Sequence, residues 1–168
     1  MSATDKILTI DYEKCTGCRL CELVCAVKHD GISNPARSRI KVMKWEAEGV
    51  YIPMSCQQCQ DAPCMIGCPV SAISRSTEMG RVEVDYEVCI GCRSCVSVCP
   101  FGAMNFNTID RKVIKCDLCD GEPQCVRFCE VKAVDFIDAG DASILKKKQA
   151  AQRLYSADKR SAAIESER

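Results

Sequence analysis

A run of four closely spaced cysteines constrains this chain more than any other feature of its sequence. Cys89, Cys92 and Cys95 follow one another at intervals of three, Cys99 comes four residues later, and Pro100 follows it. Thiolates in the run C-x-x-C-x-x-C-x-x-x-C-P hold iron–sulfur clusters, and the fourth cysteine ligates the cluster of a neighbouring motif. The segment therefore predicts an iron–sulfur centre that needs a second motif close by.

Three further cysteine motifs of related spacing complete the set. They are Cys15, Cys18, Cys21 and Cys25, then Cys56, Cys59, Cys64 and Cys68, then Cys116, Cys119, Cys125 and Cys129. A similar sequence pattern follows the fourth cysteine of three motifs: Cys68-Pro-Val-Ser-Ala-Ile73, Cys99-Pro-Phe-Gly-Ala-Met104 and Cys129-Glu-Val-Lys-Ala-Val134. This is an internal repeat whose unit corresponds to half a ferredoxin.

The redox state of the cellular compartment decides whether the 16 cysteines form disulfides or bind metal. The N-terminal residues lack a basic segment followed by an apolar one, and no apolar run reaches the ~18 residues of a membrane span. We therefore predict a cytoplasmic chain without a membrane span, in which reduced cysteines bind metal. Structural zinc and disulfides are the alternatives, but zinc sites usually pair two C-x-x-C knuckles across a long spacer, and a reducing cytosol disfavours disulfides.

Charge and composition exclude some functions. Basic and acidic residues are equal at 23 each, so nothing suggests a nucleic-acid partner. Four oxidised 4Fe–4S cubes with their thiolates would add about −8 to the charge. With four Phe, four Tyr and one Trp the conventional core is thin, and we expect the chain without its clusters to fold poorly.

The remaining pattern predicts an α+β fold of two dicluster modules with short helices, β-hairpins and a C-terminal helix. A strand is expected at residues 7–12, and hairpins at 39–53, at 73–86 with a turn around Met79 and Gly80, and at 105–114. Residues 1–137 would form the cluster domain. Residues 138–168 would form a helical tail with Asp141 as N-cap, either solvated or docked on another subunit or a second copy.

The exchange of fourth ligands leaves two ways to pair the motifs. Adjacent pairing joins first with second and third with fourth, whereas nested pairing joins first with fourth and second with third. Only Cys68 and Cys99 are followed by proline, which fixes the exit of the chain. Halves of one pseudo-symmetric module should share that detail, which favours nesting. The outer module then contains residues 15–25 and 116–129, and the inner module residues 56–68 and 89–99.

In its four motifs, its two prolines and the hairpin after its first motif, the chain resembles the four-cluster ferredoxin-like subunits of molybdenum- and tungsten-pterin oxidoreductases. Dimethyl sulfoxide reductase and tungsten aldehyde oxidoreductase contain such subunits. The resemblance implies four 4Fe–4S clusters with nested ligation. The outer ligand sets would be Cys15, Cys18, Cys21 and Cys129, and Cys116, Cys119, Cys125 and Cys25. The inner sets would be Cys56, Cys59, Cys64 and Cys99, and Cys89, Cys92, Cys95 and Cys68.

Some relatives replace a cysteine of the third motif and hold a three-iron cluster, but Cys92 is present here. The resemblance also implies a large pterin-containing catalytic subunit as partner, with the tungsten aldehyde oxidoreductase type as the first choice. A flavoprotein or ferredoxin would exchange electrons with the other end.

The sequence contains no pattern typical of a substrate site. His29 is expected to be a surface or packing residue, and Arg19, Arg93 and Arg127 to form surface salt bridges. We therefore predict an electron-relay subunit that is not an enzyme by itself. The alternatives are a free polyferredoxin, the ferredoxin-like subunit of a hydrogenase, formate dehydrogenase or carbon monoxide dehydrogenase system, and a structural zinc or assembly protein.

Overall fold

The computed structural model describes residues 6–77, 80–144, 146–147 and 150–151, which form a small mixed helix and strand fold. Its strands are β1 (Lys6–Ile10), β2 (Lys41–Trp45), β3 (Val50–Met54), β4 (Ile73–Arg75), β5 (Val82–Val84), β6 (Asn105–Asn107), β7 (Lys112–Ile114) and β8 (Val134–Asp138). Its helices are α1 (Leu20–Asp30), α2 (Pro63–Ile66), α3 (Ser94–Val98) and α4 (Gln124–Arg127), with short 3-10 turns at Tyr12–Lys14, Pro35–Arg37 and Leu118–Gly121.

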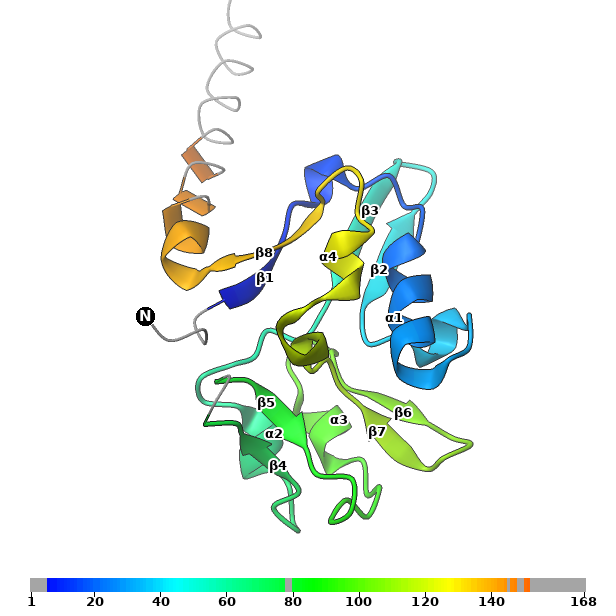
Figure 1. The fold of residues 1–168 in the computed structure, drawn as a ribbon, viewed down its shortest axis with the longest axis vertical. Helices are drawn as coiled ribbons and strands as arrows, with labels where there is room; N and C mark the ends of the chain where they lie inside the picture. The colour runs from blue at the N-terminus through cyan, green and yellow to red at the C-terminus, as the bar shows by residue number, and fades with distance from the viewer. Residues whose placement is uncertain (1–5, 78–79, 145, 148–149, 152–168) are drawn as a thin grey trace, which may run out of the picture.

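These elements form two lobes (Figure 1). In the outer lobe β1 pairs antiparallel with β8, and α1 contacts α4. This lobe also contains the hairpin of β2 and β3, whereas the inner lobe contains α2, α3 and the hairpins β4–β5 and β6–β7. The two ends of the described chain thus meet in the outer lobe, and the middle of the chain forms the inner one.

The three hairpins predicted from the sequence are present. Strand β2 pairs with β3 so that Met43 lies opposite Ile52, and β6 pairs with β7 so that Phe106 lies opposite Val113. Strands β4 and β5 pair in the predicted place, although part of their connection, residues 78–79, lies outside the described residues. The predicted first strand is shorter than expected, because β1 ends at Ile10 and a 3-10 turn begins at Tyr12.

The repeated sequence pattern that follows three of the motifs adopts the same backbone conformation in each copy. The third residue after the fourth cysteine is left-handed in each copy, with φ of 52° at Ser71, 58° at Gly102 and 52° at Lys132. The alanine that follows is buried each time, at positions 72, 103 and 133. The amides of Ala72 and Ala133 donate to the Sγ atoms of Cys68 and Cys129 at 3.2 Å. The repeat therefore turns the chain back toward its own cysteine before the next strand begins.

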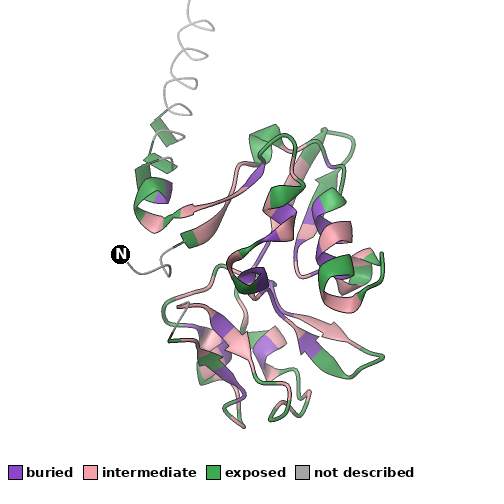
Figure 2. Ribbon diagram, in the orientation of Figure 1, coloured by how far each residue is buried: buried purple, intermediate pink, exposed green. Residues whose placement is uncertain are grey.

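Cysteines lie at the centre of both hydrophobic cores, which Figure 2 shows as the purple segments inside each lobe. The outer core is made of Cys21, Cys25, Ile40, Val42, Cys125 and Val134. The inner core is made of Ala62, Cys64, Ile73, Val82, Cys95, Met104 and Val113. Neither core is large, and cysteines contribute several of the residues in each.

The C-terminal segment departs from its prediction. Helix begins at residue 139, directly after β8, so Asp141 lies inside the first turn and is not an N-cap. The β8 strand leads straight into this helix, and the predicted break at residues 138–141 is absent. Most of the predicted tail lies outside the described residues. Within the described part of the chain, every helix is too short or too polar to cross a bilayer.

Candidate iron–sulfur centre

All four motif loops turn in the same way between their first and second cysteines. The residue before the second cysteine is left-handed in each loop, with φ of 71° at Gly17, 50° at Gln58, 68° at Gly91 and 59° at Leu118. A left-handed residue reverses the chain within one peptide unit, which turns both flanking sulfurs toward the inside of the loop. The third cysteine of each motif is then the second residue of a helix: Cys21 in α1, Cys64 in α2, Cys95 in α3 and Cys125 in α4.

Glycine is required at two of these turns. A Cβ atom at Gly17 would lie 2.5 Å from the Tyr51 ring, and one at Gly91 would lie 2.4 Å from the carbonyl oxygen of Arg111. At either position a side chain would force the neighbouring atoms to move. The first and third motifs therefore need glycine both for the left-handed backbone and for the close approach of a neighbour.

One inner cavity brings together cysteines from two motifs. Its lining contains the first three cysteines of the second motif and the last cysteine of the third: Cys56, Cys59, Cys64 and Cys99. The thiols of Cys64 and Cys99 interact electrostatically there. Cys68 belongs to the same core as the third-motif cysteines Cys89 and Cys95. The second and third motifs thus share one interior.

The outer lobe joins the first and fourth motifs in a corresponding way. Burial raises the pKa of Cys125, and the neighbouring sulfurs of Cys116 and Cys25 raise it further. Burial, the carboxylate of Glu22 and the sulfurs of Cys18 and Cys15 raise the pKa of Cys21 to about 12. Cys25 of the first motif therefore lies among the sulfurs of the fourth.

This donor set fits iron–sulfur clusters. Burial raises the pKa of Cys116 to about 12 and that of Cys95 to about 11, so these two thiols stay protonated at neutral pH when no metal is bound. Grouped buried thiolates become stable only when a cationic core balances their charge, and loading then releases their protons. Backbone amides add hydrogen bonds to sulfur, including the Arg39 amide to Cys25 at 3.3 Å. Such bonds help to set cluster potentials.

Exposure distinguishes the sulfurs. Among the 16 cysteines only Cys18 and Cys92 are exposed, and each is the second cysteine of a glycine-containing motif. By contrast Cys116, Cys119 and Cys125 of the fourth motif are all buried. In each lobe, therefore, the motif with the exposed cysteine is the one that contains the glycine turn.

A charged group beside the fourth motif was not anticipated from the sequence. His29 Nδ1 donates to the carbonyl of Cys25 at 2.8 Å, and Nε2 lies 3.0 Å from Asp117 Oδ1. The same nitrogens lie 3.9 Å and 4.0 Å from the sulfurs of Cys25 and Cys119. Burial lowers the pKa of His29, but the hydrogen bonds to Asp117 and to the sulfurs raise it to about 12. His29 is therefore a packing residue, as predicted, but one whose ring contacts two sulfurs.

The three motif arginines have local partners. Arg19 pairs with the buried Glu22, whose other oxygen accepts from the Val42 amide at 2.7 Å and so ties α1 to β2. Arg93 stacks 3.9 Å from the centre of the Phe106 ring, and Arg127 lies 5.9 Å from that of Phe128. The salt bridge predicted for Arg19 is present, whereas Arg93 and Arg127 lie against aromatic rings.

Comparison with known proteins agrees with this chemistry. Residues 47–139 match the family described as 4Fe–4S dicluster domain, and residues 8–25 match a 4Fe–4S binding domain. The chain is 42% identical to the polyferredoxin-like subunit of the aliphatic sulfonate oxidoreductase of Pyrococcus furiosus, over 73% of this chain and 70% of that one. It is 35% identical to an iron–sulfur protein of Rhodospirillum rubrum, over 79% and 82% of the two chains. It is 30% identical to formate hydrogenlyase subunit 2 of Escherichia coli, over 86% and 88%. The chain belongs to the family of ferredoxin-like proteins with 4Fe–4S dicluster domains.

Proposed function

We propose that this protein is an electron-transfer subunit that holds four 4Fe–4S clusters and serves a catalytic oxidoreductase partner. The observation that carries the proposal is the shared cavity in which Cys99 joins Cys56, Cys59 and Cys64. A cysteine from one motif that lies in the cavity of another is the ligand exchange expected of a two-cluster ferredoxin module.

The ligand assignment follows the nested pairing. In the inner lobe the sets are Cys56, Cys59, Cys64 and Cys99, and Cys89, Cys92, Cys95 and Cys68. In the outer lobe they are Cys116, Cys119, Cys125 and Cys25, and Cys15, Cys18, Cys21 and Cys129. The contacts of α1 with α4 and of α2 with α3 support this pairing, because each brings together the third cysteines of the two motifs concerned.

Neighbouring sulfurs give the four sets an order. Three pairs of sulfurs from different motifs lie close enough for one to raise the pKa of the other. Cys21 raises the pKa of Cys125, Cys56 raises that of Cys116, and Cys64 raises that of Cys95. The order is therefore first motif, fourth motif, second motif, third motif. When bound, each 4Fe–4S cube takes up and releases one electron, so a row of such cubes relays electrons between its ends.

The exposed ends of this row fit exchange with partners. Cys18 at one end and Cys92 at the other are the exposed cysteines, so both ends can approach the surface of another protein. The fourth motif lies in the middle of the row, and its first three cysteines are buried in the protein. Burial in the middle and exposure at the ends suit a relay that exchanges electrons only at its ends.

The kind of partner is inferred from the relatives. Two of them are named as subunits, one of an aliphatic sulfonate oxidoreductase and one of formate hydrogenlyase. From the resemblance of the cysteine motifs we further propose a pterin-containing catalytic subunit with tungsten or molybdenum at one end, and a flavoprotein or a ferredoxin at the other. A freely diffusing polyferredoxin is the second candidate, because exposed cysteines at both ends suit diffusional exchange equally well.

Anaerobic purification of the native protein tests the proposal. Iron and sulfide analysis should give about sixteen of each per chain, from four cubes of four. A visible charge-transfer band should bleach on addition of dithionite. Zinc in place of iron would overturn the cluster assignment. Co-elution with a large pterin-containing protein is expected for a dedicated subunit, and elution as a lone small protein would favour the free polyferredoxin.

A further inference from the structure

A buried lysine lies at the junction between the two lobes, directly before the fourth motif. Lys115 is 2% exposed. It follows β7 and shares the inward face of that segment with Val113, two residues earlier. A charged ammonium in such a place is costly unless an opposite charge or a full set of hydrogen bonds balances it.

All the acceptors that Lys115 contacts are uncharged. Its Nζ donates to the Gln58 side-chain oxygen at 3.2 Å, to the carbonyl of Cys116 at 3.0 Å and to the carbonyl of Val82. Within the described residues no ion pair of Lys115 is found. The hydrogen bonds fix the position of the ammonium group and leave its charge unbalanced.

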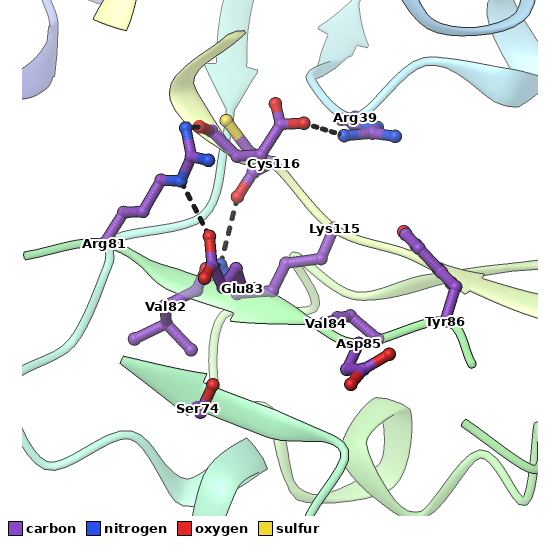
Figure 3. Close-up of a pocket in the computed structure, with 11 residues that line it drawn as sticks. Arg39, Ser74, Arg81, Val82, Glu83, Val84, Asp85, Tyr86, Lys115 and Cys116 are labelled. Carbon is purple, nitrogen blue, oxygen red and sulfur yellow. Dashed lines mark hydrogen bonds and ion pairs between the residues drawn. The ribbon is translucent and has the colours of Figure 1, made fainter. Parts of the chain in front are cut away.

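The neighbouring arginines show the contrast. Figure 3 shows the polar pocket at the lobe junction, which Lys115, Arg39 and Arg81 line together. Arg39 pairs with Asp117, and Arg81 pairs with Glu83 and Asp120. Both guanidinium groups therefore have carboxylate partners, and Lys115 has none among the described residues.

The unbalanced charge faces the cysteines of one ligand set. Lys115 also lines the cavity that contains Cys56, Cys59, Cys64 and Cys99. Its charge lowers the pKa of Cys64 there, although burial of that thiol outweighs it. Lys115 thus lies between the polar pocket and the cavity that would hold a cube.

Gln58 holds the lysine in this place. Its side-chain oxygen accepts from Lys115 and from the Val82 amide, and its side-chain nitrogen donates to the Cys116 carbonyl at 2.8 Å. Gln58 adopts a left-handed conformation, with φ of 50°, at the position where two other motifs have glycine. Such a strained conformation persists where the surrounding structure holds it, and three hydrogen bonds hold the side chain of Gln58.

We infer that Lys115 is the internal counter-charge of the cube held by Cys56, Cys59, Cys64 and Cys99, and that it raises the reduction potential of that cube. The inference rests on the proposed function. A 4Fe–4S cube with four thiolates carries about −2 when oxidised and −3 when reduced, so a fixed cation stabilises the reduced form more. Lys115 itself carries no electron in this account; its charge changes the energy of the cube beside it.

The test is a redox titration followed by electron paramagnetic resonance on the complete, loaded protein. Lys115→Met removes the charge with little change in volume. Lys112→Met removes an exposed cation from the same segment and is the matched control. We expect four loaded cubes in each variant, with one midpoint potential shifted downward in Lys115→Met and none in the control. The shifted signal should be the one altered by Cys99→Ser. Unchanged potentials, or an equal shift of all four, would overturn the inference.

Further variants decide the result if Lys115→Met fails to load one cube. Lys115→Arg keeps the charge and should load all four, and Gln58→Glu sets a carboxylate against the ammonium and should lower the same potential. If Lys115→Arg also loses the cube, or Gln58→Glu leaves the potential unchanged, shape and not charge is what matters, and the inference fails. A wild-type protein without iron would instead defeat the proposed function, so the two failures are distinguishable.

Discussion

The first and third motifs differ from the second and fourth at one position of the same turn. The left-handed residue before the second cysteine is Gly17 or Gly91 in the first pair of motifs, and Gln58 or Leu118 in the second pair. In the glycine motifs the next cysteine is exposed. In the other two it is half-buried or buried, and the side chain before it points into the protein.

This difference shows what the two kinds of motif do for the fold. A glycine at the turn lets neighbouring chain pack closely and leaves the second sulfur at the surface. A side chain at the turn costs about 1 kcal/mol of backbone strain, but it adds contacts in the interior. Leu118 is 4% exposed, and Gln58 hydrogen-bonds the second motif to the fourth. The first and third motifs therefore leave one cysteine accessible to solvent, whereas the second and fourth motifs contribute side chains that join the lobes.

Removal of iron should have the largest effect. The cores of both lobes contain several cysteines, and without bound clusters these side chains would leave each core small. We expect the chelated, reduced protein to lose cooperative unfolding and most of its secondary structure. Circular dichroism during thermal denaturation measures this. A protein that keeps a sharp transition without iron would show that the cores do not need their clusters.

Gly91→Ala should have the next largest effect. Its Cβ would meet the backbone oxygen of Arg111, which cannot move away easily, and its φ of 68° adds strain. We expect a loss of about 3 kcal/mol in the free energy of unfolding. Gly17→Ala is the matched variant, because its clash is with the Tyr51 ring, which can shift. Denaturant titration of the loaded proteins should rank Gly91→Ala as more destabilised, and the reverse order would contradict the geometry.

Gln58→Gly tests the other side of the difference. Glycine relieves about 1 kcal/mol of left-handed strain, but it removes three hydrogen bonds worth about 1 kcal/mol each. A net loss of about 2 kcal/mol is expected, measured by denaturant titration. A variant as stable as the wild type would mean that the side chain of Gln58 does not join the lobes.

The sequence predicted the local features well and the distant contacts poorly. The hairpins were found because alternation and turn residues lie within each segment. The pairing of β1 with β8 was not predicted as a pair of strands, because five alternating residues do not specify a partner more than a hundred residues away. The N-cap at Asp141 was wrong because β8 continues directly into the helix. Lys115 could have been noticed, since alternation places it on the face of buried Val113.

The contacts of His29 had no signal in the sequence. Its partner Asp117 is 88 positions away, and only the packing of α1 against the fourth motif brings the two together. The loop conformations, by contrast, followed partly from the glycines, because a glycine before a cysteine predicts a tight turn. The same left-handed turn at Gln58 and Leu118 could not be predicted, since glutamine and leucine rarely adopt this conformation.

Arg93→Ala should have the smallest effect. Its guanidinium stacks on Phe106 at the accessible end of the inner lobe, a contact worth about 0.5 kcal/mol. A small decrease in melting temperature is expected, with all clusters retained. Arg127→Ala serves as the control, because its contact with Phe128 is longer at 5.9 Å. An equal or larger decrease in melting temperature for Arg127→Ala would contradict a stabilising role for the stacking of Arg93 on Phe106.

The most direct measurement of the shared architecture is the electron paramagnetic resonance spectrum of Cys99→Ser, recorded beside those of Cys56→Ser and Cys92→Ser. If the fourth ligands are exchanged between the second and third motifs, Cys99→Ser alters the same cube signal as Cys56→Ser. If Cys99→Ser instead alters the signal that Cys92→Ser alters, each motif holds its own cube, and the nested arrangement is wrong.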